Sequence, residues 1–207
     1  MDEIRQTPVL DHEGPVDGRT RRRTRNRTAV ISALLAMIRE GDLHPGAAEI
    51  AERAGVSHRS IFRYFDDLDD LVRTAIDQAF RDAAPLSAVP DVGRGPLAER
   101  IERFVDARLE LFAFVDGTMQ LARMRAYSIP SIDEEIAVIA EQFRVQIGEH
   151  FAAELESVED PARGFLVDAV LVLTSYDSYT IHLRLLGSPV ERIRAAWTTG
   201  LAALLKN

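Results

Sequence analysis

The segment from Ala47 to Tyr64 constrains the fold of this chain more than any other. Two short helices that cross steeply need a small residue where their backbones meet, and Ala51 provides it. They also need a tight turn, and Gly55 follows four residues later, where a left-handed backbone is easiest without a side chain. Apolar side chains follow at offsets that would lie beneath the pair: Ile50, Ala54, Val56, Ile61 and Tyr64. The segment therefore predicts two crossing helices joined by a glycine turn.

The second of these helices presents a polar, basic face. Hydroxyl, imidazole and guanidinium groups suit base edges and phosphates in a DNA major groove, and Ser57 is also placed to cap the helix through its hydroxyl. The candidate DNA-contacting residues are Ser57, His58, Arg59, Ser60, Arg63 and Tyr64. The alternative is an ordinary solvated helix face. For Tyr64 a second alternative is a ring that anchors the core, with only its hydroxyl reaching phosphate.

The charge of the chain is unevenly distributed. The net charge is -8, yet residues 18–65 hold ten arginines against four acidic residues, and residues 66–207 hold 14 basic against 24 acidic residues. This asymmetry predicts one surface for a polyanion and another kept away from it. A basic arm, Arg19–Arg27, leads into the first half, and its candidate DNA contacts are Arg21, Arg22, Arg23 and Arg25. An unbound basic tail is the alternative.

The sequence lacks the motifs that are typical of several classes of protein. The chain has no cysteine, which excludes disulfides, thiolate metal sites and cysteine nucleophiles. We find neither a leader pattern nor a long apolar run, so we expect a soluble, cytoplasmic protein that contacts no membrane. Gly-rich phosphate loops, Glu-x-x-His pairs and Gly-x-Ser-x-Gly elbows are missing as well. We therefore predict no enzyme activity, no cofactor and no metal.

The pattern of apolar residues divides the chain into three parts. Residues 1–18 mix proline, glycine and acids, and we expect a disordered tail. Residues 19–83 form the basic arm and a helical head: one helix begins near Asn26 and ends at Gly41, the crossing pair follows, and Asp66 and Asp67 cap a fourth helix. Residues 84–207 form a second, helical domain after a proline- and glycine-rich joint.

Periodicity in the second domain predicts helices only. The first begins at Leu97 and is broken at Asp116-Gly117, and a short segment follows from Thr118 to Tyr127. A capping box of Ser131 and Glu134 opens a long helix reaching Leu155. The remaining predictions are a helix from Asp160-Pro161 to Gly187 and a last helix after Ser188-Pro189.

The chain resembles the tetracycline-repressor (TetR-type) transcriptional regulators. The stretch that matches best is EIAERAGVSHRSIFRYFDDLDDL, within residues 27–80. The resemblance implies an all-α fold, with a three-helix helix-turn-helix DNA-binding head and a helical ligand-binding and dimerisation body. It also implies a homodimer formed mainly by the last two helices.

Three positions depart from the pattern of that family. Pro45-Gly46 stands where Ser or Thr usually begins the second helix, Phe62 replaces a Tyr, and Leu68 replaces a Lys. Each change removes an expected phosphate contact, and such contacts fix register and supply much of the affinity. The arginine arm is a candidate replacement, because such arms can enter the minor groove.

In the body, aromatic and methionine residues at helical spacing are candidates for a ligand pocket, although the same residues would equally suit a plain core. The ligand-binding candidates are Phe104, Phe112, Met124, Tyr127, Phe143, Phe165 and Tyr176. The last two helices supply the dimer candidates Leu173, Thr180, Arg184, Ile193, Trp197 and Leu201. Trp197 would equally suit the core of a single chain.

The resemblance implies a ligand-responsive repressor. Two copies would bind double-stranded DNA at a near-palindromic operator, and a small-molecule effector would release them. One alternative is a DNA-binding helical protein without a sensor pocket. The other is a helical-bundle enzyme or small-molecule-binding protein that has lost DNA binding.

Overall fold

The computed structural model describes residues 18–206. These residues form helices and no β-strand, as the sequence predicts. The predicted tail lies outside the described residues except for Gly18, which begins the first helix. In chain order the elements are α1 (Gly18–Arg39), α2 (Ala47–Arg53), α3 (His58–Tyr64), α4 (Leu68–Ala83), the 3-10 turn η1 (Ala84–Ser87), α5 (Leu97–Ala126), α6 (Pro130–His150), α7 (Ala152–Leu155), α8 (Ala162–Leu173), α9 (Tyr176–Thr180), the π-helical turn η2 (Ile181–Leu185) and α10 (Val190–Leu205).

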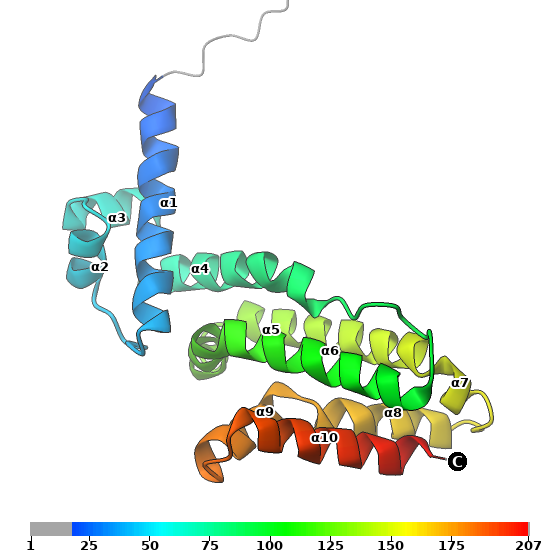
Figure 1. Cartoon of the computed structure of the whole chain (residues 1–207). Helices are drawn as coiled ribbons and strands as arrows, with labels where there is room; N and C mark the ends of the chain where they lie inside the picture. Colours follow the sequence, from blue (N-terminus) through cyan, green and yellow to red (C-terminus); the bar gives the residue numbers. More distant parts are fainter. Residues whose placement is uncertain (1–17, 207) are drawn as a thin grey trace, which may run out of the picture.

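The head consists of α1, α2 and α3, and α4 leads from it into the body (Figure 1). Asp67 caps α4 as predicted, because its carboxylate accepts a hydrogen bond of 2.7 Å from the backbone N–H of Asp70. In the body, α5 packs against α6 and α10, and α8 packs against the same two helices. The predicted division at residue 83 falls at the end of α4.

Two hydrophobic cores hold the molecule together. The first lies in the head, but it also takes in Leu121 and Ala122 from α5 and Ile132 from α6. The second lies within the body and includes Ala83 at the end of α4. Head and body are therefore joined by shared apolar packing as well as by the chain itself.

Four sequence-based helix boundaries are wrong. The first helix begins at Gly18 rather than near Asn26, because the basic arm holds no helix-breaking residue and arginine is a good helix former. Helix α5 passes through Gly117 without a break. Helix α6 begins at Pro130 with no side-chain cap, so the Ser131–Glu134 capping box does not form. It ends at His150, and α7 continues to Leu155.

The predicted helix from Asp160-Pro161 to Gly187 is interrupted. Helix α8 ends at Leu173, and Ser175 then caps α9 by accepting a hydrogen bond from the N–H of Ser178 at 3.1 Å. Serine competes with the helical backbone for hydrogen bonds, which is why it favours a new helix start here. Helix α10 begins directly after Pro189, as predicted.

Candidate nucleic-acid interface and body groove

The turn between α2 and α3 has the predicted geometry. Gly55 adopts a positive φ of 66°, and the backbone N–H of Val56 donates to the carbonyl of Ala51 at 3.0 Å. Ala51 is buried where the helices approach, and Ile50 and Ile61 are fully buried beneath them. Ser57 occupies the N-cap position of α3, but its hydroxyl contacts the Ser60 hydroxyl at 2.8 Å instead of capping the helix.

The outward face of α3 is basic and aromatic. His58, Arg59, Phe62 and Arg63 are all exposed, and the rings of His58 and Phe62 meet edge to face with their centroids 5.1 Å apart. Within residues 18–206, the side chain of Arg59 has no hydrogen bond and no ion pair. Its guanidinium is therefore available for a ligand.

Tyr64 is chiefly an anchor of the head. Its side chain is buried, and its hydroxyl accepts hydrogen bonds from Asn26 of α1 at 3.2 Å and from Arg63 at 2.7 Å. The hydrogen bond from Asn26, assisted by that from Arg63 and by the nearby positive charge, lowers the pKa of the Tyr64 hydroxyl. Both bonds use the oxygen as acceptor, so the O–H can still donate to a phosphate.

A cationic groove lies between the start of α1 and helix α3. Its volume is about 580 Å³. The residues that line it are Arg19, Arg22, Arg23, Asn26, Gly55, Val56, Ser57, Ser60, Arg63 and Tyr64. None of these described lining residues is acidic. Arg19, Arg22 and Arg23 share this face because residues three and four apart in a helix are neighbours, whereas Arg21 and Arg25 are exposed elsewhere on α1.

The three departures from the family pattern have local structural explanations. The backbone N–H of Gly46 donates to the Glu49 carboxylate at 2.7 Å, so α2 is capped from within. Phe62 is exposed and has no hydroxyl, and Leu68 is half-buried behind the Asp67 cap. None of these positions presents a side chain that can donate a hydrogen bond to phosphate.

The body contains a mostly apolar groove of about 290 Å³ between α4, α5 and α6. The lining residues are Phe80, Arg81, Ala83, Ala84, Ser87, Leu111, Phe112, Val115, Met119, Glu135, Val138, Ile139, Gln142 and Phe143. Of the predicted pocket residues, this set includes Phe112 and Phe143. The rim also holds Glu135, and burial together with the neighbouring Asp77 carboxylate raises the pKa of Glu135 to about 6.

The other predicted pocket residues lie outside the groove. Met124, Tyr127 and Phe165 are exposed, because each points away from the helix packing of its own chain. Phe104 is fully buried, and its ring stacks on His150 with the centroids 5.8 Å apart. Tyr176 is buried against Phe112, and its hydroxyl donates to the Asp116 carboxylate at 2.8 Å. No sequence pattern indicated Glu135 or the groove-lining end of α4.

Half of the predicted dimer residues belong to the core of the single chain. Ile193, Trp197 and Leu201 are 0 % exposed, and the indole N–H of Trp197 donates to the Ser178 hydroxyl at 3.1 Å. This face of α10 packs on α5 within the chain.

The remaining predicted dimer residues also make contacts within the chain. Arg184 pairs with Asp116 at 2.5 Å, Leu173 packs against Gly200, and the Thr180 hydroxyl donates to the Asp177 carbonyl at 2.9 Å. The outer face of α8 instead exposes Phe165 and Val172, each 68 % exposed.

Two absences apply to the part of the chain that the structure describes. No group of three or more His, Asp or Glu side chains in residues 18–206 is arranged to hold a metal ion. Among the same residues, no helix combines the length and the apolar character needed to cross a membrane.

The glycine turn, the exposed α3 and the cationic groove define a helix-turn-helix head attached to a helical body. A family model described as "Bacterial regulatory proteins, tetR family" matches residues 30–75. No curated protein matches the chain. Within those residues, the head carries the sequence pattern of the TetR-family regulators.

Solved structures of similar fold extend the likeness over the body. A tetR-family transcriptional regulator from Streptomyces coelicolor is 22% identical, with a TM-score of 0.68 over 87% of this chain and 80% of that one. A transcriptional regulator from Rhodococcus sp. Rha1 is 19% identical, with a TM-score of 0.65 over 88% and 95%. The multidrug binding protein EbrR, complexed with imidazole, is 21% identical, with a TM-score of 0.57 over 94% and 97%.

Proposed function

We propose that this protein is a dimeric transcriptional repressor that a small molecule releases from a near-palindromic operator. The observation that carries the proposal is the cationic groove between α1 and α3, which lies beside the exposed Arg59. Arginine reads guanine through two hydrogen bonds in the major groove, and the arginines of α1 supply phosphate or minor-groove contacts. The cationic groove argues against a protein that has lost DNA binding.

The groove in the body is the proposed effector site. It combines apolar walls with a few polar groups, which is the usual make-up of a small-molecule pocket, and it distinguishes this proposal from a DNA binder without a sensor. EbrR, a protein of similar fold, was solved in complex with imidazole.

Helix α4 is the proposed lever between effector and DNA. Its first turn lies in the head, where Asp69 pairs with Arg125 of α5 at 3.4 Å, and its last turn supplies Phe80 and Ala83 to the groove. A ligand that displaces this last turn would move the head. Coupling of about 1–3 kcal/mol is enough to change DNA affinity roughly 5- to 150-fold.

The proposed dimer interface lies on the outer faces of α8 and α10. Phe165 and Val172 give α8 an exposed apolar face, which a second copy of the chain would cover. Two heads would then contact half-sites about 34 Å apart, or a multiple of that distance.

The test begins with selection of bound DNA from a random library, followed by titration of the selected operator and of unrelated DNA. Arg59→Ala should weaken specific binding by about 1–3 kcal/mol and leave non-specific binding nearly unchanged. Arg39→Ala removes the same charge at the far end of α1 and is the matched control (Figure 1). Equal losses on both DNAs would refute base readout by Arg59, and a library without an enriched sequence would refute operator binding.

A further inference from the structure

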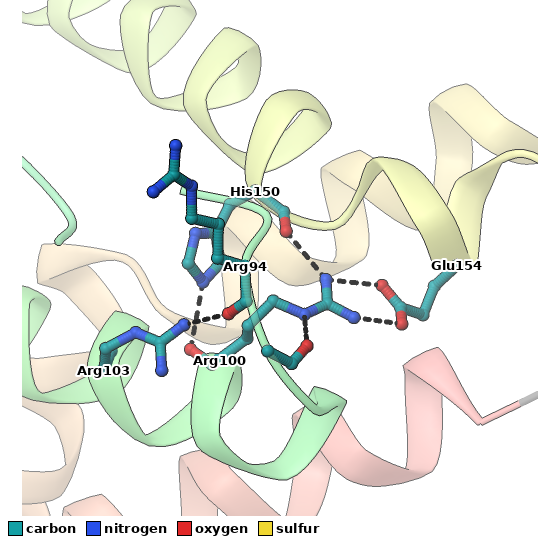
Figure 2. Close-up of polar contacts among 6 residues, drawn as sticks. Arg94, Arg100, Arg103, His150 and Glu154 are labelled. Atoms are coloured by element: carbon teal, nitrogen blue, oxygen red, sulfur yellow. Dashed lines mark hydrogen bonds and ion pairs between the residues drawn. The ribbon is translucent and has the colours of Figure 1, made fainter. Parts of the chain in front are cut away.

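Helix α5 buries two arginines, and the first is completely paired. Arg100 forms a bidentate ion pair with Glu154, with one bond at 2.9 Å, and donates to the carbonyls of His150 at 2.8 Å and Gly95 at 3.1 Å. Figure 2 shows this network joining the start of α5 to the end of α6 and to α7. The charge is therefore compensated within the chain, as buried charges usually are.

The second arginine, Arg108, lies two turns further along and has no such partner. Its side chain is 1 % exposed, and neither terminal guanidinium nitrogen makes a hydrogen bond among the described residues. Its contacts are with two aromatic faces: the guanidinium carbon lies 3.7 Å from the ring centroid of Phe143 and 4.8 Å from that of Phe104. Burial lowers the pKa of Arg108 to about 9, so the group is charged at neutral pH.

Arg108 adjoins the body groove. Leu111 and Phe112, one turn later on the same helix, line the groove, and so does Phe143, whose ring covers the guanidinium. Rotation of the Phe143 side chain would connect the groove with Arg108. Aromatic faces attract a cation but accept no in-plane hydrogen bonds from a guanidinium, so the donors remain open to an acceptor that enters from the groove.

We propose that Arg108 binds the acidic group of the effector, and that the effector is an amphiphilic organic carboxylate. This inference rests on the proposed function, because it assigns a ligand class to the proposed effector groove. A carboxylate matches the planar fork of a guanidinium through two parallel hydrogen bonds. The apolar side chains of Leu111, Val115 and Val138 would then enclose the hydrocarbon part of the ligand.

The charge and polarity of the site disfavour cationic ligands and neutral amides. A cationic ligand would add a second positive charge beside Arg108, and a neutral amide would offer only one acceptor oxygen. A second copy of the chain cannot supply the anion, because Arg108 is enclosed by its own helices. The proposed ligand is therefore a free small carboxylate.

Direct binding of matched probes tests the inference. Octanoate, octanamide and octylammonium share one chain and differ in charge. Trp197, the only tryptophan, lies edge to face with Phe112 at 6.2 Å and provides a fluorescence signal, with calorimetry as a second readout. Wild-type protein should bind octanoate about tenfold to a hundredfold more tightly than octanamide, as expected for charge-assisted hydrogen bonds, and should not bind octylammonium.

Substitutions of single arginines test whether the carboxylate binds at Arg108. Arg108→Met should abolish the preference for octanoate, whereas Arg94→Met, at an exposed position outside the groove, should keep it. The inference is overturned if Arg108→Met keeps the preference, if Arg94→Met loses it, if octanamide or octylammonium binds as tightly as octanoate, or if none of butanoate, octanoate and dodecanoate binds.

A stability measurement separates ligand binding from a structural role. Arg108→Met should raise or maintain Tm, because an unpaired buried charge is costly, and Arg100→Met should lower it, because Glu154 would lose its partner. A fall in Tm for Arg108→Met as large as that for Arg100→Met would overturn the inference. DNA binding is measured in the absence of ligand. A protein that binds no operator would therefore refute the proposed function, whereas the preference for carboxylate would be unaffected.

Discussion

Gly117 of α5 lies directly against the backbone carbonyl of Ile38 in α1. A Cβ atom at Gly117 would stand 2.8 Å from the Ile38 carbonyl oxygen and 3.1 Å from its Cγ2. Helix α1 belongs to the head and α5 to the body, so the two parts meet backbone to backbone at this point. The absence of a side chain at residue 117 is what permits the approach.

Gly117→Ala should therefore destabilise the protein. An alanine inside a helix normally stabilises it by about 1 kcal/mol relative to glycine, but here the Cβ would press on backbone atoms that cannot rotate away, at a cost of about 1–3 kcal/mol. Urea denaturation measures the free energy of unfolding. Gly148→Ala in α6 is the control, because a Cβ there meets nothing within 4 Å, and it should be stabilising. Equal stabilisation by both variants would show that the head is not seated on Gly117.

The continuation of α5 through Gly117 could not be predicted from the sequence. A glycine after an aspartate reads as a helix break, and only the approach of α1, which is distant in sequence, explains why α5 continues through it. The α2–α3 turn was predictable because its determinants, Ala51, Gly55 and Ile61, are local. The body groove was not, because it depends on how the end of α4 meets α5 and α6.

The core position of three dimer candidates could not be predicted from the sequence for a related reason. Ile193, Trp197 and Leu201 recur at helical spacing, which is the same for a core face and for an interface face. Their burial against α5 is set by tertiary packing. Arg108 gave no signal at all, since an arginine among apolar residues usually extends its charge to water.

The arginines of α1 that line the cationic groove should set the salt dependence of DNA binding. Replacing both Arg22 and Arg23 by Gln should reduce the slope of log K against log salt by about 1.8, since each phosphate contact contributes about 0.9. Fluorescence anisotropy across a salt series measures the slope. The pair Arg21→Gln and Arg25→Gln removes equal charge from positions outside the groove and should have a smaller effect. An unchanged slope in the Arg22 and Arg23 variant would show that this side of α1 does not contact DNA.

The exposed face of α8 should control assembly. Phe165→Asp should convert a dimer into a folded monomer, because Phe165 is exposed in the single chain and its loss leaves the core intact. Trp197→Ala should instead unfold the chain, at a cost of about 3–5 kcal/mol for a buried aromatic side chain. Sedimentation and thermal melts distinguish the two results. Phe114→Asp, at an exposed position on α5, is the control, and a dimer that survives Phe165→Asp would place the interface elsewhere.

Glu135 should make the body groove sensitive to pH. Burial and the Asp77 carboxylate raise the pKa of Glu135 from 4.5 to about 6, although the positive charges of Arg81 and Arg73 lower it. Because the folded pKa is the higher one, the folded protein holds the proton between these values. Its stability relative to a Glu135→Gln variant should be greatest below about pH 4.5 and should be lost as pH rises to about 6.

The same titration should affect ligand binding. Above pH 6 the Glu135 carboxylate places a negative charge on the rim of the groove, so octanoate should bind wild-type protein more weakly at pH 7.5 than at pH 5.5. The expected difference is about threefold to tenfold, because two like charges several ångströms apart in a partly solvated site repel by roughly 1 kcal/mol. Calorimetry at the two pH values measures it. Glu135→Gln should remove most of the dependence, whereas the exposed neighbour Glu134→Gln should keep it. Identical pH profiles for wild type and Glu135→Gln would show that this carboxylate does not face the bound anion.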